Sequence, residues 1–304
     1  MEKDLILRIS GETGEVISEF EIDSNESLTT SEKLLKRKKY LKNRTQMSML
    51  NNQLGGFVKI FYISNEILYQ NTLNPQDVAR FLFISTYIDY DNILKKDDKP
   101  LNKKELWRLT FLRANTFNEL YQRLIDKHFI VEHENGSISV NEEKVIKGEH
   151  KENNKSYTRM YINTIRNLYN GCDQRKHKSL GYLFKLIPFL NYETNMVCFE
   201  NEKFSPMTTQ DIMMLLDISV KSKGSISQFN KQLLDFTITF KGKDYPVFGK
   251  ISFETRKGKI VNGWIVNPCL FYRSSNFANA QTLLSLLFEY SSKWGTYFLL
   301  ILGI

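Results

Sequence analysis

The sequence predicts an α+β fold that is mainly α-helical and contains two copies of one domain. Gly and Pro are scarce, at 15 and 6 of 304 residues, which favours helices with a few strands over a loop-rich all-β fold. The chain is long enough for two ordinary domains, and one residue pattern recurs about 100 positions further on. Because 41% of the residues are hydrophobic, with 21 Phe and 15 Tyr, we expect both copies to bury a core.

The first 54 residues are expected to form two elements ahead of the copies. Residues 1–24 alternate apolar and polar side chains around Gly11-Glu12-Thr13-Gly14, which predicts a small N-terminal β-hairpin. Residues 25–54 predict a basic helical linker capped at Thr30 or Ser31. Two interpretations of this linker stay open: a solvated spacer, or an arm that follows DNA phosphates. The candidate phosphate contacts are Lys36, Arg37, Lys38 and Lys39.

A residue pattern repeats along the rest of the chain. Phe57 to Phe61 and Tyr157 to Tyr161 both follow the order aromatic, any, basic, apolar, aromatic, at an offset of 100. The offset grows to 106 where Leu101 to Leu109 matches Met207 to Leu215, and then to 109 in the helices that follow. An offset that grows only across loops is typical of a duplicated domain. We therefore predict a first copy at residues 55–150 and a second copy at residues 155–275.

Each copy has the same predicted order of elements. A short aromatic strand precedes an apolar helix, which residues 78–87 form in the first copy, and a charged loop follows. Two shorter helices come next; Asn102 with Glu105 predicts a capping box on the first of them. Alternating strands end the copy. Helix, helix, turn, helix and β-hairpin is the order of the winged helix-turn-helix, whose third helix can enter the major groove of DNA. The predicted fold is thus two tandem winged helix-turn-helix domains after the N-terminal hairpin.

Three motifs resemble a known module: the aromatic-basic openings, the helices that lead to Asp89-Tyr90 and Asn191-Tyr192, and the run Asn267-Pro268-Cys269-Leu270-Phe271-Tyr272. Each copy resembles the winged-helix module of replication initiators from Firmicute plasmids and phages. The resemblance implies a protein that recognises repeated sites at a replication origin. Phage transcription regulators share this module. The first copy departs from the pattern, because it closes with Val140-Asn141-Glu142 and lacks the Asn-Pro pair.

The polar residues of each third helix are the candidate DNA contacts. Asn and Gln side chains bond adenine and Arg bonds guanine, whereas Ser and Lys suit phosphates. The alternative is that these residues are only the solvated side of a helix. In the first copy the candidates are Arg113, Asn115, Thr116, Asn118, Gln122 and Arg123. In the second copy they are Lys221, Lys223, Ser225, Ser227, Gln228, Asn230 and Lys231, with Arg256, Lys257 and Lys259 at the tip of the wing. The first wing is acidic, so one copy is expected to bind DNA more strongly than the other.

Composition restricts the partners. The chain has 42 Lys and Arg against 34 Asp and Glu, a formal charge of +8 that favours anionic partners such as nucleic acid. Three widely separated cysteines and the absence of a signal-peptide pattern predict reduced thiols in a cytoplasmic protein. The apolar stretch from Tyr297 to Ile304 is too short to span a membrane. We expect the apolar tail at residues 276–304 either to pack back on the second copy or to form a homodimer contact.

We predict no catalytic centre, cofactor or metal site. Gly242 to Lys250 has the wrong spacing for a phosphate-binding loop, and Ile251 stands where Ser or Thr would hold magnesium. The four histidines are scattered, which excludes the His-x-His pair of a rolling-circle nuclease, and no Cys-x-x-Cys pair exists.

Three hypotheses for function remain open. The first is a replication initiator that binds double-stranded DNA at origin repeats and recruits host replication factors. The second is a transcriptional regulator of a phage or mobile element, with host transcription factors as partners. The third is a winged-helix module that binds protein.

Overall fold

The computed structural model describes residues 3–9, 16–61, 73–149, 156–200, 204–220, 222–254, 260–292 and 299–300. Within these residues the fold is α+β, with nine α-helices and several small antiparallel sheets. The chain divides into two compact units, residues 1–49 and residues 50–304. In the described part of the chain, no helix combines the length and the apolar character needed to cross a bilayer.

The N-terminal unit is a hairpin followed by a long helix. β1 (Lys3–Ile9) and β2 (Val16–Asp23) pair antiparallel, which confirms the predicted hairpin. α1 (Ser24–Gln53) follows at once and begins at Ser24, so the predicted cap at Thr30 or Ser31 is wrong. The helix runs on into the second unit, where Leu50 and Leu54 are buried.

The second unit is built around a four-stranded sheet in the order β14-β9-β3-β8. Its central strands are β3 (Phe57–Phe61) and β9 (Tyr157–Tyr161), the repeated motifs that open the two copies. They pair antiparallel with Lys59 directly opposite Arg159. Since these two residues hold the same place in the repeat, the pairing relates the two copies by an internal two-fold axis.

The outer strands obey the same two-fold relation. β8 (Val145–Ile146) pairs with β3 through Ile60 and Val145. β14 (Phe271–Tyr272) pairs with β9 through Met160 and Phe271, the corresponding positions. The similarity therefore extends from the first strand of each copy to its last.

An asparagine closes each copy in the same way. Asn141 and Asn267 each donate from Nδ2 to a backbone carbonyl and accept at Oδ1 from the backbone N–H two residues on. The partners are His128 and Glu143 for Asn141, and Pro246 and Cys269 for Asn267, at 3.0 and 2.9 Å in both copies. The first copy lacks the proline of the Asn-Pro pair, yet Asn141 makes the same turn.

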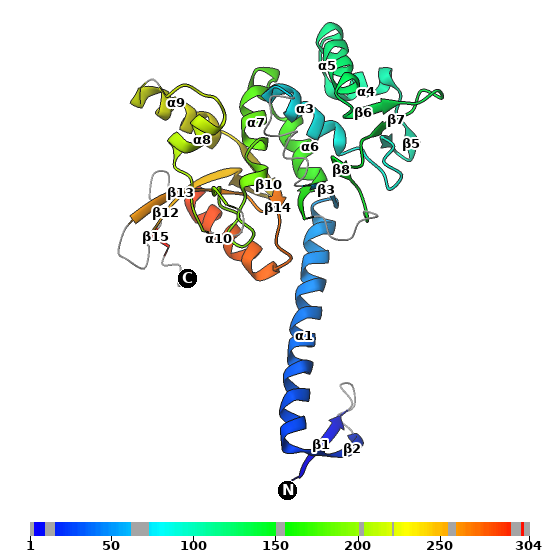
Figure 1. Ribbon diagram of the computed structural model, residues 1–304, viewed down its shortest axis with the longest axis vertical. Coiled ribbons are helices and arrows are strands. Elements are labelled where there is room, and N and C mark those ends of the chain that lie inside the picture. Colours follow the sequence, from blue (N-terminus) through cyan, green and yellow to red (C-terminus); the bar gives the residue numbers. More distant parts are fainter. Residues whose placement is uncertain are drawn as a thin grey trace. The chain divides into compact units, whose positions relative to one another are not determined.

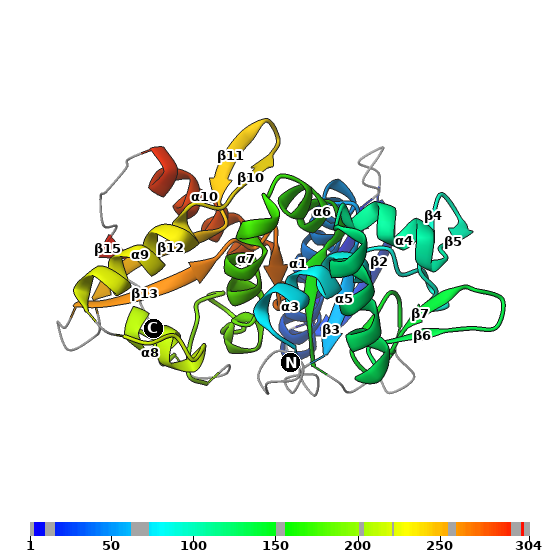
Figure 2. The same ribbon diagram turned by 90° about the horizontal axis from the view of Figure 1, so that it is seen from above.

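The helices of the two copies also correspond (Figures 1 and 2). The first copy contains α3 (Pro75–Ser85), α4 (Lys103–Thr110), α5 (Ala114–Asp126) and the hairpin of β6 (Ile130–Glu132) and β7 (Ile138–Val140). The second contains α7 (His177–Phe184), α8 (Thr209–Leu215), α9 (Lys223–Leu234) and the hairpin of β12 (Phe248–Glu254) and β13 (Ile260–Val266). Asn102 and Thr208 cap α4 and α8 with the same capping box.

Several further elements lie between the matched ones. β4 (Lys95–Lys96) and β5 (Lys99–Pro100) form a hairpin where the first copy was predicted to have only a loop. β10 (Thr237–Phe240) and β11 (Lys243–Pro246) form another, inserted between α9 and β12 of the second copy. The second copy contains α6 (Ile162–Asn170) and the 3-10 helices η2 (Gln174–Lys176) and η3 (Ile187–Phe189); residues 62–72, the segment of the first copy that matches α6 in the repeat, lie outside the described residues.

The C-terminal tail packs on the second copy. It contains α10 (Phe277–Ser292) and β15 (Leu299–Leu300), which pairs in parallel with β12. Ala280, Leu283 and Leu287 of α10 are buried. Of the two predicted roles for the tail, the described residues confirm packing within the chain.

The two copies meet along α3 and α7, which lie between α5 on one flank and α9 on the other (Figures 1 and 2). The contact is close because α7 carries a glycine: a Cβ at Gly181 would lie 1.6 Å from the backbone oxygen of Pro75. Beside this crossing the rings of Phe83 and Tyr169 stack with their centroids 3.9 Å apart. The helices that the sequence predicts to be buried thus form the junction between the copies.

Candidate nucleic-acid interface

α5 has one apolar side and one polar side. Phe117, Leu120 and Leu124 are buried, at the helical spacing that the sequence predicts. The polar candidates on the other side are mostly exposed. Arg113, Asn115, Asn118 and Gln122 are exposed, and Thr116 is half-buried.

Arg123 differs from the other candidates on α5, because it is held by a buried carboxylate. Its Nε donates to Oδ2 of Asp77 on α3 at 2.8 Å, and its Nη2 donates to Oδ1 at 3.2 Å. Arg80 Nη1 lies 3.3 Å from the same carboxylate. The Asp77 hydrogen bond raises the pKa of Arg123. Arg123 therefore anchors α5 on α3, a role that the periodicity of α5 alone could not reveal.

α9 presents a smaller and more basic polar side. Lys223, Ser227, Gln228 and Lys231 are exposed, whereas Ser225 and Asn230 are half-buried. Ser225 is part of the helix cap, since its backbone N–H donates to Oγ of Ser222 at 3.3 Å. Lys221 lies outside the described residues. The exposed set suits phosphate contact better than base reading.

The remaining basic candidates lie on a wing and on α1. Arg256, Lys257 and Lys259, at the expected tip of the β12–β13 hairpin, lie outside the described residues. Lys36, Arg37, Lys38 and Lys39 are exposed on α1 in the N-terminal unit. In the first wing, the acidic residue Glu132 accepts a hydrogen bond from Tyr121 Oη at 2.8 Å. Burial, aided by this bond, raises the pKa of Tyr121.

Two lysines that the sequence analysis did not select lie beside α5. Lys103 and Lys104 form the first turn of α4 and line a hollow of about 310 Å³ with Trp107 and Asn118. Cations are disfavoured at a helix N-terminus by the helix dipole. Lys103 Nζ lies over the ring of Tyr121 on α5, 4.7 Å from its centroid, a contact that places a cation there.

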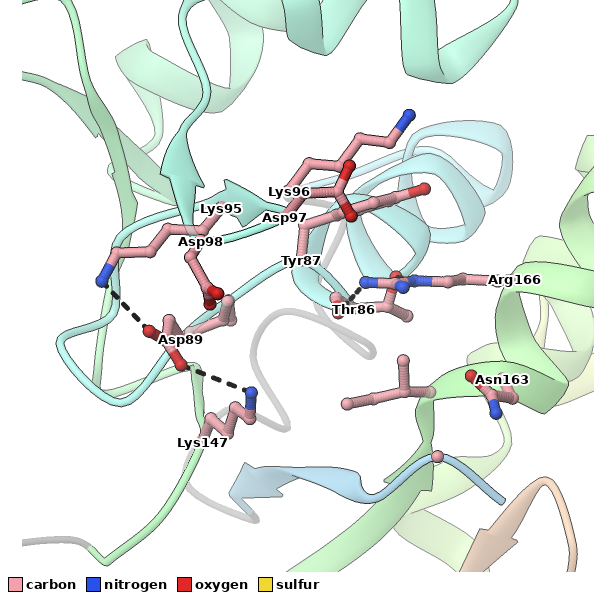
Figure 3. Close-up of a pocket in the computed structure, with 13 residues that line it drawn as sticks. Thr86, Tyr87, Asp89, Lys95, Lys96, Asp97, Asp98, Lys147, Asn163 and Arg166 are labelled. Carbon is pink, nitrogen blue, oxygen red and sulfur yellow. Dashed lines mark hydrogen bonds and ion pairs between the residues drawn. The ribbon is translucent and has the colours of Figure 1, made fainter. Parts of the chain in front are cut away.

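A polar cavity of about 330 Å³ lies where α6 meets the end of α3 (Figure 3). Arg166 donates from Nε to Thr86 Oγ1 at 2.9 Å and from Nη2 to Thr86 O at 2.7 Å, so it caps α3 from the other copy. On the opposite side, Asp89 lies 3.0 Å from Lys95 Nζ and 3.4 Å from Lys147 Nζ. At this cavity Asp89 pairs with two lysines, and the bonds from Arg166 to Thr86 join the two copies.

Cys198 and Cys269 are buried. Burial raises the pKa of the Cys198 thiol to about 11 and that of Cys269 to about 12, so both are neutral thiols at neutral pH. Within the described ranges, no group of three His, Cys, Asp or Glu side chains is placed to hold a metal ion.

Comparison of the chain with protein-family models, with curated proteins and with solved structures finds no match.

Proposed function

We propose that this chain is a sequence-specific double-stranded DNA-binding protein made of two winged-helix domains, which read DNA with α5 and α9. The observation that carries the proposal is the pairing of Lys59 with Arg159 across β3 and β9. This pairing makes α5 and α9 equivalent elements of two copies that share one sheet. Each of them has a polar, exposed side.

The internal two-fold axis restricts the DNA target. Duplex DNA has its own two-fold axes, and proteins with two-fold symmetry align with them to read two half-sites in opposite orientation. A single copy of this chain carries both reading helices. We therefore propose that one molecule occupies a site with two inverted half-sites, which the two copies recognise separately.

The half-sites are read with different stringency. α5 offers Asn115, Asn118 and Gln122, whose side chains suit base edges in the major groove. α9 offers Lys223 and Lys231 among small hydroxyl residues, which suit phosphates. The first copy therefore supplies most of the sequence discrimination and the second copy supplies much of the non-specific affinity.

The cellular role that we propose is replication initiation at origin repeats of a plasmid or phage, with host replication factors as partners and no covalent chemistry. Transcriptional regulation of a phage or mobile element is the second candidate, since it needs the same DNA-reading surface.

Sequencing the genomic fragments that the purified chain retains tests this proposal. Enriched fragments with clustered copies of one site support an origin, and a single isolated site supports an operator. The site should consist of two inverted half-sites, and inverting one of them should abolish specific binding. Retention that enriches no sequence and does not weaken as salt rises contradicts DNA binding and favours a protein-binding module, because phosphate contacts release counterions.

A further inference from the structure

A second cavity, of about 560 Å³, lies between the turn that joins α4 to α5 and the segment that joins α6 to α7. We name it the Phe111 cavity. Gln174 Nε2 donates to the backbone oxygen of Phe111 at 2.6 Å, and Tyr169 Oη donates to that of Thr110 at 3.3 Å. These bonds connect its two walls, one from each copy. The lining residues used below are Phe111, Arg113, Asn170, Arg175 and His177.

An exposed aromatic ring stands at the rim in a strained backbone conformation. Phe111 is 69% exposed and has a φ of 54°, in the left-handed region. The equivalent residue of the second copy is Asp217, with a φ of 55°. Aspartate tolerates this region much better than a bulky aromatic residue does. Neither core packing nor turn geometry explains a phenylalanine here, and strained residues of this kind cluster at binding sites.

Two arginines line the cavity without an ion pair, and the Asp173 carboxylate, which lies in the same lining, accepts from the backbone N–H of Arg175. Arg113 and Arg175 are both exposed, and within the described part of the chain neither guanidinium forms an ion pair. In the cavity of Figure 3, by comparison, Lys95 and Lys147 are paired with carboxylates. Guanidinium groups free to form paired hydrogen bonds are the preferred protein ligands for phosphate.

The floor of the cavity contains a buried polar atom without a partner. His177 is 1% exposed, and its Nδ1 is buried with no hydrogen-bond partner. Its ring stacks on Tyr169 with the centroids 4.4 Å apart. Burial, reinforced by the charge of Arg80, lowers the pKa of His177 to about 4, so the imidazole is neutral at neutral pH.

We propose that the Phe111 cavity binds a nucleotide, as a site additional to the duplex-binding helices. The base stacks on the ring of Phe111, and Arg113 and Arg175 hold the phosphate. A free nucleotide and an unpaired nucleotide of a single strand share this chemistry. Because one wall is the turn before α5, an occupied cavity would also fix the orientation of that helix.

Fluorescence anisotropy of an ADP analogue labelled on the ribose tests the proposal on the full chain. AMP should displace the probe more strongly than adenosine or inorganic phosphate alone. A short oligothymidylate that competes better than TMP identifies a single strand as the source, and the reverse order identifies a free nucleotide. Failure of the probe to bind at millimolar concentration overturns the proposal.

Two variants locate the site. Phe111→Asp installs the residue that the second copy tolerates at this turn, and Arg175→Gln removes one exposed cation, so both should fold. Each should weaken probe binding about tenfold, the typical effect of losing one stacking or phosphate contact. Lys178→Gln, which removes the same charge three residues further on and outside the cavity, should leave binding unchanged. Equal affinity in all four proteins overturns the assignment. Duplex binding by the unmodified chain does not bear on this result, so the two proposals can fail separately.

Discussion

Arg123 Nε lies 2.8 Å from Oδ2 of Asp77, and this contact fixes the third helix of the first copy to the helix at the junction between copies. Asp77 is fully buried and also accepts from Arg80. A cluster of one carboxylate and two guanidinium groups is stable only while the carboxylate is present, since an uncompensated buried charge is costly.

We expect Asp77→Ala to lower the free energy of unfolding by roughly 3–5 kcal/mol, because it leaves Arg80 and Arg123 without their anion. Urea unfolding followed by circular dichroism measures this. Arg123→Met should cost less, since Arg80 still pairs with Asp77, and it should leave the sequence preference for DNA intact. If Arg123→Met folds normally but loses its sequence preference for DNA, Arg123 contacts DNA as well as Asp77.

Gly181→Ala tests the close crossing of α3 and α7. A Cβ there would lie 1.6 Å from Pro75 O, so the helices must separate, and we expect a loss of roughly 1–3 kcal/mol or more. Gly224→Ala is the control. Its Cβ would meet nothing nearer than 3.4 Å in α9, so stability should hold or rise by about 0.5–1 kcal/mol. Thermal unfolding measures both variants. Equal melting temperatures for Gly181→Ala and Gly224→Ala would contradict the close crossing of α3 and α7.

His177 should make the fold sensitive to acid. Its folded pKa is about 4, below the ordinary value of 6.5, so the unfolded chain takes up this proton first as the pH falls. Stability should thus decrease between pH 6.5 and pH 4, by on the order of 3 kcal/mol from this group. Urea midpoints across this window measure the loss. In His177→Phe the slope should be shallower; equal slopes in the two proteins would show that another group is responsible.

The polar side of α5 should carry base recognition. We expect Gln122→Ala and Arg113→Ala each to weaken binding to the selected site by about 1–3 kcal/mol, with little change on random duplex. Gln281→Ala removes the same amide from an exposed position on α10 and serves as the control. Unaltered affinity of both α5 variants for the selected site would mean that the docking face is assigned wrongly.

The lysines of α9 should act on all sequences alike. Changing Lys223 and Lys231 together to Ala should weaken every duplex and reduce the slope of log affinity against log salt by about two. Lys257 and Lys259, changed together, should behave in the same way. A loss confined to the selected site would instead assign these lysines to base reading.

The repeat pattern predicted which segments correspond, but it could not predict how the copies associate. The motifs that begin at Phe57 and Tyr157 share one residue pattern, which identifies them as equivalent strands. Their antiparallel pairing depends on hydrogen bonds between the two strands, and no sequence periodicity reports these bonds. The strand at Thr237–Phe240 was predicted, but its partner β11 was missed because an insertion in one copy has no equivalent segment to align with. The correspondence of Asn141 with Asn267 was hidden because the neighbouring proline is present only once.

Helical periodicity also predicted the buried side of α5 correctly, but it could not reveal the partner of Arg123. Periodicity gives the direction in which a side chain leaves its own helix, and a long arginine can still turn back to a carboxylate on a neighbouring one. The Phe111 cavity was not foreseen for a similar reason: its walls are about 60 residues apart in sequence, and no local pattern connects them.

The pairing of β3 with β9 places both partners of a symmetric assembly in one polypeptide. Protomers of an ordinary dimer separate on dilution, and any substitution changes both of them at once. Here the two copies stay joined at any protein concentration, because they belong to one chain. Each copy can also acquire a substitution that the other copy does not carry. An aromatic residue at one turn and an aspartate at its counterpart is the kind of divergence that such a covalent arrangement permits.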